Sequence, residues 1–243
     1  MAEQSIVWIS GATEGIGAGL ARHVPYPDAR VINLSRRQHP ELETVPFDLT
    51  DPSTWPAVVQ HFERELSGFS GRRAIFVQNA HDSGTSGYAG EVDLDRIHAD
   101  VTANVAAPLV LADGFLRACR PGYESGLVLL TSASARVPMQ GMSVYCAAKA
   151  ALEQWVRVVR RERQSRGLGP WVVAVRPGFV DTPSTRSAAL RDEREYPAGP
   201  ALRKALEAGV AVDPDSVARD IWAALPPPPD TSILLFGEVP DGM

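Results

Sequence analysis

The stretch SIVWISGATEGIG, Ser5–Gly17, decides what fold the chain is expected to adopt. A short apolar, β-prone run leads into a glycine-rich turn, and a helix-like segment, Ala18–His23, follows. Glycines let the backbone turn tightly and approach a pyrophosphate, to which a helix N-terminus offers unpaired N–H groups. The stretch therefore predicts a dinucleotide-binding turn, with a purely structural turn between a buried strand and its helix as the alternative. The candidate contacts are Gly11, Thr13, Gly15, Ile16 and Gly17.

Strand-like runs alternate with helical patterns along the rest of the chain, which is typical of a parallel sheet with helices on both faces. A chain of 243 residues, 44% of them hydrophobic, can bury one sizeable core. We therefore expect a single α/β domain over residues 1–243, with a doubly wound parallel sheet of about seven strands. The expected strands are Ser5–Ser10, Arg30–Ser35, Thr44–Phe47, Arg73–Gln78, Gly126–Thr131, Trp171–Arg176 and Ser232–Phe236.

Tyr145 and Lys149 lie four residues apart in Tyr-Cys-Ala-Ala-Lys, at the start of a helix-like stretch. Residues i and i+4 share a helix face, so the phenol and the ammonium project side by side. A nearby cation favours the phenolate, so we expect Lys149 to lower the pKa of Tyr145, which suits a proton donor in carbonyl reduction. Ser132, after the apolar run Gly126–Thr131, could hold the carbonyl oxygen. Alone, a Tyr-x-x-x-Lys pair more often marks a solvated helix face.

Taken together, these motifs resemble the short-chain dehydrogenase/reductase family, in order from Ser5 to about Thr182. The resemblance implies a Rossmann-type fold and makes Tyr145 the catalytic acid/base. It implies that Lys149 lowers the pKa of Tyr145 and binds the nicotinamide ribose, that Ser132 orients the carbonyl, and that Asn104 holds a proton-relay water. The motif residues are Gly11, Gly15, Gly17, Asn79, Ala80, Asn104, Ser132, Tyr145, Lys149, Pro177, Gly178 and Thr182, and further implied cofactor contacts include Val180.

The end of the second expected strand bears on cofactor choice. A carboxylate there usually holds the ribose 2′-OH of NAD, whereas a guanidinium favours the 2′-phosphate of NADP. Ser35 and Arg36 occupy the tip, so we predict NADP (NADPH); a solvated arginine pair, Arg36 and Arg37, is the alternative. Asp48 and Leu49 resemble the adenine-contacting position of the family, although Asp48 could equally cap the next helix.

Composition narrows the partners. The net charge of −5 and pI near 5.6 give no basic footprint, which argues against a nucleic acid or an anionic membrane. Two cysteines, Cys119 and Cys146, are too few for a disulfide scaffold or a zinc site, and no metal site is expected. No apolar run approaches membrane-spanning length, and no secretory leader is recognised. We expect a soluble, cytoplasmic protein.

Two loops depart from the family pattern. His81 replaces a glycine of the usual Asn-Asn-Ala-Gly, which puts the local backbone in doubt. His81 either touches substrate or is a half-exposed loop histidine without function. The polar stretch 82–87 that follows is either part of the active-site rim or a surface loop. Residues 179–212, charged and rich in Ala and Arg, either cover the substrate or form a solvated excursion.

A loose resemblance of the segment around Ala201–Leu206 to sepiapterin reductases and bacterial benzil reductases implies reduction of a small ketone, such as one carbonyl of an aromatic or heterocyclic vicinal diketone. Glu238 is the nearest candidate for the acidic residue that meets the substrate in sepiapterin reductases; an exposed C-terminal glutamate is the alternative. An acyl-carrier-protein ketoreductase, with Arg186, Arg191 and Arg194 as docking charges, and a non-catalytic NADP-binding regulator remain open.

Ala99–Ala118 is expected to be a long helix that is apolar on nearly every face and therefore buried on more than one side. In the family this helix and the one carrying Tyr145 commonly pack against another subunit, which implies a homodimer or homotetramer; a broad intrachain core is the alternative. Pro108 cannot donate to the Asn104 carbonyl, so the helix is predicted to kink there. The freed carbonyl would then hold an ordered water.

Overall fold

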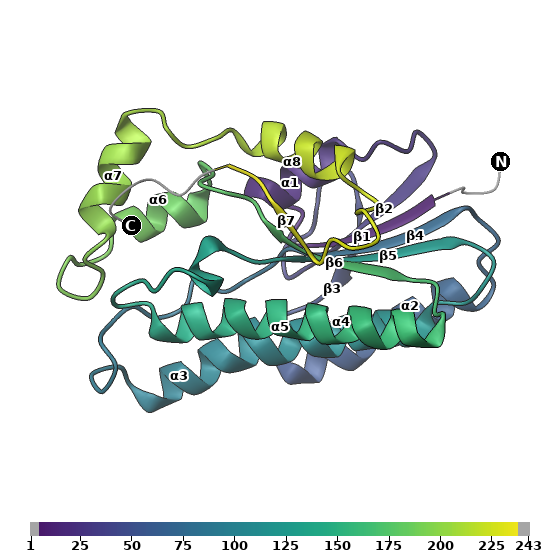
Figure 1. Cartoon of the computed structure of the whole chain (residues 1–243), viewed down its shortest axis with the longest axis horizontal. Coiled ribbons are helices and arrows are strands. Elements are labelled where there is room, and N and C mark those ends of the chain that lie inside the picture. The colour runs from purple at the N-terminus through teal and green to yellow at the C-terminus, as the bar shows by residue number, and fades with distance from the viewer. Residues whose placement is uncertain (1–4, 238–243) are drawn as a thin grey trace.

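The computed structural model describes residues 5–237, which form a sheet of seven parallel strands (Figure 1). The strand order is β3-β2-β1-β4-β5-β6-β7, so the order reverses between β1 and β4. Ligands in open parallel sheets bind at the carboxyl ends of the strands beside such a reversal. The strands are β1 Ser5–Ser10, β2 Ala29–Ser35, β3 Glu43–Pro46, β4 Arg73–Gln78, β5 Glu124–Leu130, β6 Trp171–Arg176 and β7 Ile233–Leu235.

The predicted fold class is confirmed, and the predicted strand ends are wrong by at most two residues. The largest difference is at β5, which begins at Glu124 rather than Gly126. Glu124 and Ser125 are polar and have no strand pattern, but they pair with Arg73 and Ala74 of β4. The Arg73 guanidinium donates to Glu124 Oε2 at 2.9 Å, so a cross-strand ion pair extends the strand.

Helices cover both faces of the sheet. In Figure 1, α1 and α8 lie on one face and α2, α4 and α5 on the other. α5 is the longest and carries Tyr145 and Lys149 near its N-terminus. The helices are α1 Gly15–Arg22, α2 Trp55–Ser67, α3 Leu94–Val101, α4 Ala107–Ala118, α5 Ser143–Arg166, α6 Pro183–Ala189, α7 Gly199–Glu207 and α8 Pro214–Ala223, with short 3₁₀ turns at Pro52–Thr54 and Ala133–Ala135.

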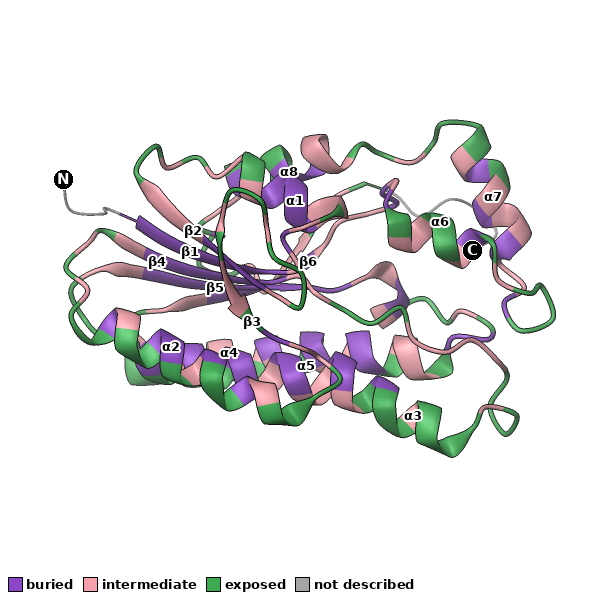
Figure 2. Ribbon diagram, turned by 180° about the vertical axis from the view of Figure 1, so that it is seen from behind, coloured by how far each residue is buried: buried purple, intermediate pink, exposed green. Residues whose placement is uncertain are grey.

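The core lies in two layers on either side of the strands, which Figure 2 shows buried between the helices. Under α2 and α4, Trp8 meets Phe62 edge to face at 5.2 Å between ring centroids, and Phe62 lies 5.1 Å from Phe76. Such pairs add about 0.5–1.5 kcal/mol to the free energy gained by burial. Under α1 and α8, the buried Trp222 indole donates to the Leu20 carbonyl at 2.9 Å. These contacts fix both helical layers against the sheet.

At Asn104, where a kink was predicted, the helix continues through a wider turn, and the kink itself stays a prediction. Between α3 and α4, residues Thr102–Ala106 form a π-helical turn, closed by a bond from the Ala107 N–H to the Thr102 carbonyl. Pro108 lies at the start of α4, directly after this turn, and its ring nitrogen has no hydrogen to donate to a carbonyl of the preceding turn. The change from π-helical to α-helical bonding therefore falls at the proline. The water predicted on the Asn104 carbonyl stays a prediction.

The sequence has no apolar run of membrane-spanning length, but one helix of the described residues passes a test of length and mean hydropathy. The continuous helical run Leu94–Ala118, 25 residues, is long and apolar enough by composition to cross a bilayer. Half of its most apolar window is buried within the protein, where α4 packs against α2, β4 and β5. Ala and aliphatic residues that fit a crowded core produce the same average hydropathy as a spanning helix, so composition alone does not separate the two.

Residues 179–212 fold as a wall rather than as a solvated excursion. They contain α6 and α7, and buried Phe179, Tyr196 and Leu202 form a small apolar cluster with Met142 from before α5. The base of the segment is pinned because Val180 and Val212 pair as a parallel bridge. The Val212 N–H donates to the Phe179 carbonyl at 2.8 Å. α6 and α7 therefore stand over the carboxyl end of the sheet (Figure 1).

Candidate active site

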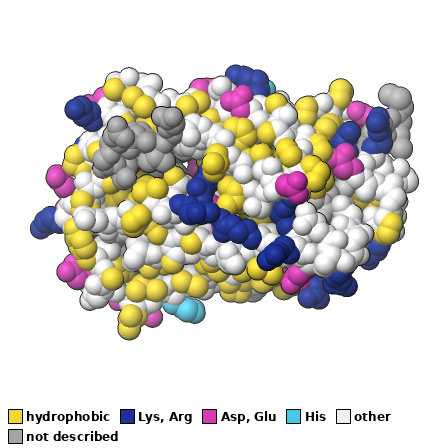
Figure 3. Space-filling view, viewed as in Figure 1, with side chains coloured by type: hydrophobic (Ala, Val, Ile, Leu, Met, Phe, Trp, Pro, Cys, Tyr) yellow, Lys and Arg dark blue, Asp and Glu magenta, His cyan; other side chains and the backbone are white. Residues whose placement is uncertain are grey.

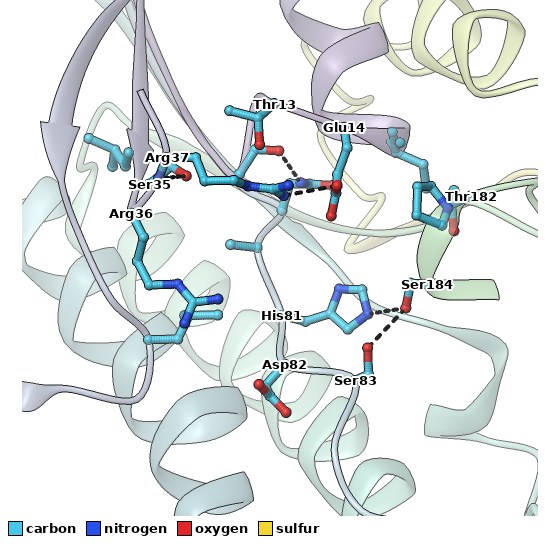
Figure 4. A pocket seen from close by; sticks show the side chains of 18 of the residues that line it. Thr13, Glu14, Ser35, Arg36, Arg37, His81, Asp82, Ser83, Thr182 and Ser184 are labelled. Atoms are coloured by element: carbon cyan, nitrogen blue, oxygen red, sulfur yellow. Dashed lines mark hydrogen bonds and ion pairs between the residues drawn. The ribbon is translucent and has the colours of Figure 1, made fainter. Parts of the chain in front are cut away.

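A cavity of about 400 Å³ lies at the carboxyl ends of β1, β2 and β4, beside the reversal in strand order (Figure 4). The glycine turn after β1 forms one side. Gly15 has φ +55°, and a Cβ at Gly17 would lie 2.0 Å from the Gly11 carbonyl oxygen, so no other residue fits position 17. β2 holds the turn in place, because the Ala12 N–H donates to Asn33 Oδ1 at 3.0 Å. This cradle fits the pyrophosphate of a dinucleotide.

Most predicted cofactor residues line this cavity. Gly17 does not line it; it lies underneath, where it allows the turn to pack closely. Asn79 lines the cavity and also fixes the turn, since its Nδ2 donates to the Ser10 carbonyl at 3.0 Å. The predicted residues on the cavity surface are Gly11, Thr13, Gly15, Ile16, Ser35, Arg36, Asp48, Leu49, Asn79, Ala80 and Thr182.

Four charged side chains surround the end of this cavity near β2. Arg36 faces Asp48 at 3.7 Å, and Arg37 pairs with Glu14 at 2.9 Å between Nη2 and Oε2. Figure 4 shows Arg37 and Glu14 pointing toward one another across the glycine turn. The side chains of Arg36 and Arg37 are 72% and 63% exposed. The sequence-based interpretation weighed Arg36 and missed Glu14, whose only signal was its place inside the glycine turn.

A second cavity, of about 200 Å³, continues from the first and contains the predicted catalytic residues Ser132, Tyr145 and Lys149. Ile16, Asn79, His81 and Thr182 line both cavities. The predicted residues Pro177, Gly178 and Val180 also line the second cavity. A molecule that extends from the first cavity into the second therefore lies beside Tyr145.

Ser132, Tyr145 and Lys149 come together from two elements. Ser132 follows β5 and caps the 3₁₀ turn Ala133–Ala135, where its Oγ accepts from the Ser134 N–H at 3.2 Å. The Ser132 hydroxyl and the Tyr145 phenol from α5 line the same cavity, and Ser132 acts to lower the pKa of Tyr145. Lys149 Nζ donates to the Leu130 carbonyl at 3.2 Å and lies 5.5 Å from the centroid of the Tyr145 ring. Both hydroxyls can therefore reach one substrate oxygen.

The expected effect of Lys149 on the phenol is wrong in this structure. Burial raises the pKa of Tyr145 to about 12, while the hydrogen bond from Ser132 and the charge of Arg191 act in the opposite direction. Burial lowers the pKa of Lys149 to about 8. Desolvation dominates at both groups because each loses water on its charged form. The ammonium is also bonded to Leu130 and not to the phenol oxygen.

Asn104 is buried in the π-helical turn beneath this cavity. Its Oδ1 accepts from the Asp82 N–H at 2.9 Å, so it orients the loop that follows β4. The π-helical turn packs against α5, the helix of Tyr145 and Lys149. The relay role that the family resemblance implied for Asn104 stays a prediction.

The sequence profile described as short chain dehydrogenase matches residues 5–193, more than half of the chain. The chain belongs to this family. A member of the family is an oxidoreductase. The benzil reductase ((S)-benzoin forming) of Bacillus subtilis is 27% identical over 226 residues, covering 89% of this chain and 91% of the relative. The 3-oxoacyl-acyl-carrier-protein reductase of Salmonella typhimurium is 27% identical over 207 residues, 79% of each chain.

Solved structures agree with this assignment. A short chain dehydrogenase from Burkholderia cenocepacia, solved in complex with NADP, superposes with a TM-score of 0.72 at 25% identity and covers 99% of this chain and 97% of its own. A short chain dehydrogenase/reductase from Saccharomyces cerevisiae has a TM-score of 0.79 at 16% identity, covering 96% and 95%, and shows the fold alone.

In this short-chain dehydrogenase a buried carboxylate lies behind the catalytic side chains. Glu153, 1% exposed, follows Tyr145 and Lys149 on one face of α5 at intervals of four residues. Arg176 donates two hydrogen bonds to its oxygens, at 2.6 and 2.8 Å, and the Thr131 hydroxyl lies 3.3 Å from Oε1. Glu153 thereby ties α5 to the residues just before Ser132 and just before Pro177. The sequence-based analysis missed it, although the spacing of four was visible.

His81 lies where both cavities of the dehydrogenase meet. No non-glycine residue in the described part of the chain has a positive φ, so the histidine adopts an ordinary backbone and the doubt about local strain is removed. Its Nε2 lies 3.2 Å from Ser184 Oγ of α6, and Figure 4 shows Ser83 turned to the same hydroxyl. His81 is exposed to solvent at the mouth of the cavities, and the surrounding protein atoms and the Lys149 ammonium act to lower its pKa.

The predicted substrate residue Glu238 and the three predicted docking arginines have different outcomes. Glu238 lies outside the described residues. Arg186 and Arg194 are each paired with a neighbouring carboxylate, Asp181 and Asp192, at 2.6 Å. Arg191 has no such partner among the residues described and lines the catalytic cavity. Of the three expected docking charges, two are therefore neutralised at the surface and one faces the site.

Proposed function

We propose that the chain is an NADPH-dependent reductase that converts a ketone of a small molecule to an alcohol, with Tyr145 as proton donor. The observation that carries the proposal is the meeting of the Ser132 and Tyr145 hydroxyls in a partly apolar cavity that continues from the dinucleotide cradle. The benzil reductase relatives support a vicinal diketone as substrate.

In this proposal, proton transfer to the substrate is divided among Ser132, Tyr145, Lys149 and Asn104. Ser132 donates a hydrogen bond to the substrate oxygen and holds it beside Tyr145. Tyr145, whose raised pKa keeps it protonated at neutral pH, gives its proton to that oxygen as negative charge develops. The Lys149 ammonium, 5.5 Å from the centroid of the Tyr145 ring, acts with Asn104 in this proposal to return the proton to Tyr145 from solvent. When bound, NADPH supplies the hydride that goes to the carbonyl carbon.

The preference for NADPH rests on Arg36 and Arg37. Both guanidiniums stand at the β2 end of the cavity, and both are exposed enough to turn toward a 2′-phosphate. Each at present faces a carboxylate, Asp48 or Glu14. A dianionic phosphate attracts a guanidinium more strongly than a carboxylate does, so exchange is favourable. The solved relative in complex with NADP supports the same choice.

The deciding experiment measures NADPH oxidation by the purified protein with a panel of vicinal diketones, quinones, pterins and acyl thioesters. Turnover of diketones is expected. Turnover of acyl thioesters alone would favour an acyl-carrier-protein ketoreductase, the activity named for another group of relatives. The neutralised pairs at Arg186 and Arg194 speak against the basic docking surface which that activity needs. Binding of NADPH without turnover of any compound would favour the regulator.

The chain is also proposed to form a homodimer or homotetramer through α4 and α5. Large hydrophobic side chains are exposed on these helices, including Val110 at 44% and Val158 at 44%, and Val101 at the end of α3 at 43%. Figure 3 shows hydrophobic side chains among the surface atoms over α3 and α5. Light scattering of the purified protein tests the assembly, and a monomer at micromolar concentration would contradict it.

A further inference from the structure

Arg191 introduces a positive charge into an otherwise largely apolar part of the catalytic cavity. It follows α6 in the wall formed by residues 179–212. Lys149 and Arg191 are the cationic side chains on the lining, and no Asp or Glu among the described residues lines it. The surrounding apolar side chains are Met139, Met142, Phe179, Ala188, Tyr196 and Leu202. The cavity therefore combines an apolar body with a net positive charge.

Neutral groups alone hold the guanidinium of Arg191. Its Nη2 donates to the carbonyl oxygens of Ser83 and Gly84 at 2.7 and 3.1 Å, and its Nη1 lies 3.4 Å from Met142 Sδ. The guanidinium also lies 5.9 Å from the centroid of the Tyr196 ring. A guanidinium has five N–H donors, so donors remain for another partner.

The position is unusual because a partly buried charge is costly without a counter-charge. The neighbouring Arg186 and Arg194 are more exposed than Arg191, and each has a carboxylate within 2.6 Å. Arg191 has no ion pair with any described residue. Its charge also reaches the reacting group, since it lowers the pKa of Tyr145 against the effect of burial.

We infer that Arg191 binds an anionic group of the substrate, so that a small ketone with a carboxylate and an apolar body is reduced faster than its neutral analogue. This inference rests on the proposed ketone reduction. The planar guanidinium matches a carboxylate with two parallel hydrogen bonds, and an apolar chain or ring fits the methionine and aromatic side chains beside it. The bonds to Ser83 and Gly84 fix the direction of the guanidinium and keep the loop 82–87 against the wall.

The test compares two ketones that differ only in charge, phenylglyoxylate and its methyl ester, with NADPH and the intact protein. The wild type is expected to reduce the acid with a kcat/KM at least about tenfold above that of the ester, the range of a charge-assisted hydrogen bond. Arg191→Gln should lower this acid-to-ester ratio about tenfold or more, and the ratio is the readout because the substitution also changes the cavity in which the ester is reduced. Arg191→Lys should keep part of the preference.

Arg194→Gln is the matched control, because that guanidinium is exposed and already paired, and its acid-to-ester ratio should not change. Equal wild-type rates for acid and ester would overturn the inference. An equal loss of both activities in Arg191→Gln would also overturn it, since that result assigns Arg191 only to holding the loop.

Failure of the proposed function is distinguishable from failure of this inference. If these two ketones and every ketone of the panel are left unreduced, the proposed function is wrong, and phenylacetate binding to the protein, measured by calorimetry, then tests the anion site directly. Binding that weakens about tenfold in Arg191→Gln but not in Arg194→Gln supports the inference without any turnover. Undetectable binding to the wild type overturns it.

Discussion

The two ends of the crevice hold their charges in opposite ways. At the catalytic end Lys149 and Glu153 are 4% and 1% exposed and are bonded to groups from β5 and β6. At the β2 end Arg36 and Arg37 are mostly exposed, and each faces one carboxylate. Breaking a buried pair strands a charge and costs about 3–5 kcal/mol, whereas an exposed pair contributes about 0–1 kcal/mol. Buried contacts thus fix the side chains at the catalytic end, whereas cofactor preference depends on exposed side chains that exchange partners easily.

Loss of the Tyr145 hydroxyl should have the largest effect. Tyr145→Phe removes the proton donor and is expected to lower kcat about 10²- to 10⁴-fold, while NADPH affinity changes less than about twofold. Steady-state rates and fluorescence titration with NADPH measure the two quantities. Tyr88→Phe, at an exposed tyrosine, is the control and should keep full activity. Substantial turnover by Tyr145→Phe would show that another group donates the proton.

Glu153→Ala tests whether the buried ion pair with Arg176 at the catalytic end stabilises the fold. The change leaves Arg176 without its two hydrogen bonds and should lower the free energy of unfolding by about 3–5 kcal/mol, measured by urea denaturation. Arg37→Gln breaks the exposed pair with Glu14 and should change stability by less than about 0.5 kcal/mol. Similar losses in both variants would remove the contrast between the two ends.

Arg36→Asp should reverse or abolish the preference for NADPH over NADH. A hydrogen bond to a charged group contributes about 1.5–3 kcal/mol, so the ratio of the two affinities should fall about 10- to 100-fold. Binding titrations with both nucleotides measure the ratio, and Arg72→Asp, remote from the cavity lining, is the control. Equal affinities of the unmodified protein for both nucleotides would refute the prediction.

Glu14→Gln should have the smallest effect, and in the favourable direction. The substitution releases Arg37 from its carboxylate and removes a negative charge from the glycine turn. NADPH affinity should rise up to about fivefold, the scale of an exposed ion pair, and NADH affinity should change less. The same titrations measure it. A fall in NADPH affinity would mean that Glu14 positions Arg37 for the phosphate instead of competing with it.

Much of the catalytic geometry was predictable because it depends on local spacing. Tyr145 and Lys149 share a helix face whatever surrounds them, and the glycine turn requires the residues that the sequence has. The direction of the Tyr145 pKa was not predictable, because it is set by burial, which arises only when distant elements pack. Glu153 was missed for a related reason: its partner Arg176 lies 23 residues away and meets it only through the packing of α5 on β6.

The wall over the substrate was the least predictable part. Its sequence, rich in charge, left open whether it covers the substrate or is a solvated excursion, and a few apolar side chains such as Phe179 and Tyr196 decide that it packs. Arg191 carries the same formal charge as Arg186 and Arg194, and the sequence offered no way to separate them. Their difference depends on where Asp181 and Asp192 lie, which is a property of the folded wall.

The bridge between Val180 and Val212 makes this wall a segment that can be replaced as one unit. The segment begins after β6 and ends before α8 at two backbone positions that pair with each other, so its ends stay together. Doubling the length of a flexible connection costs only about 0.6 kcal/mol in closure entropy. Segments of other lengths can therefore be grafted between these two valines while Ser132, Tyr145 and Lys149 keep their places. New substrate ranges would then arise by replacing one segment, with the rest of the fold inherited unchanged.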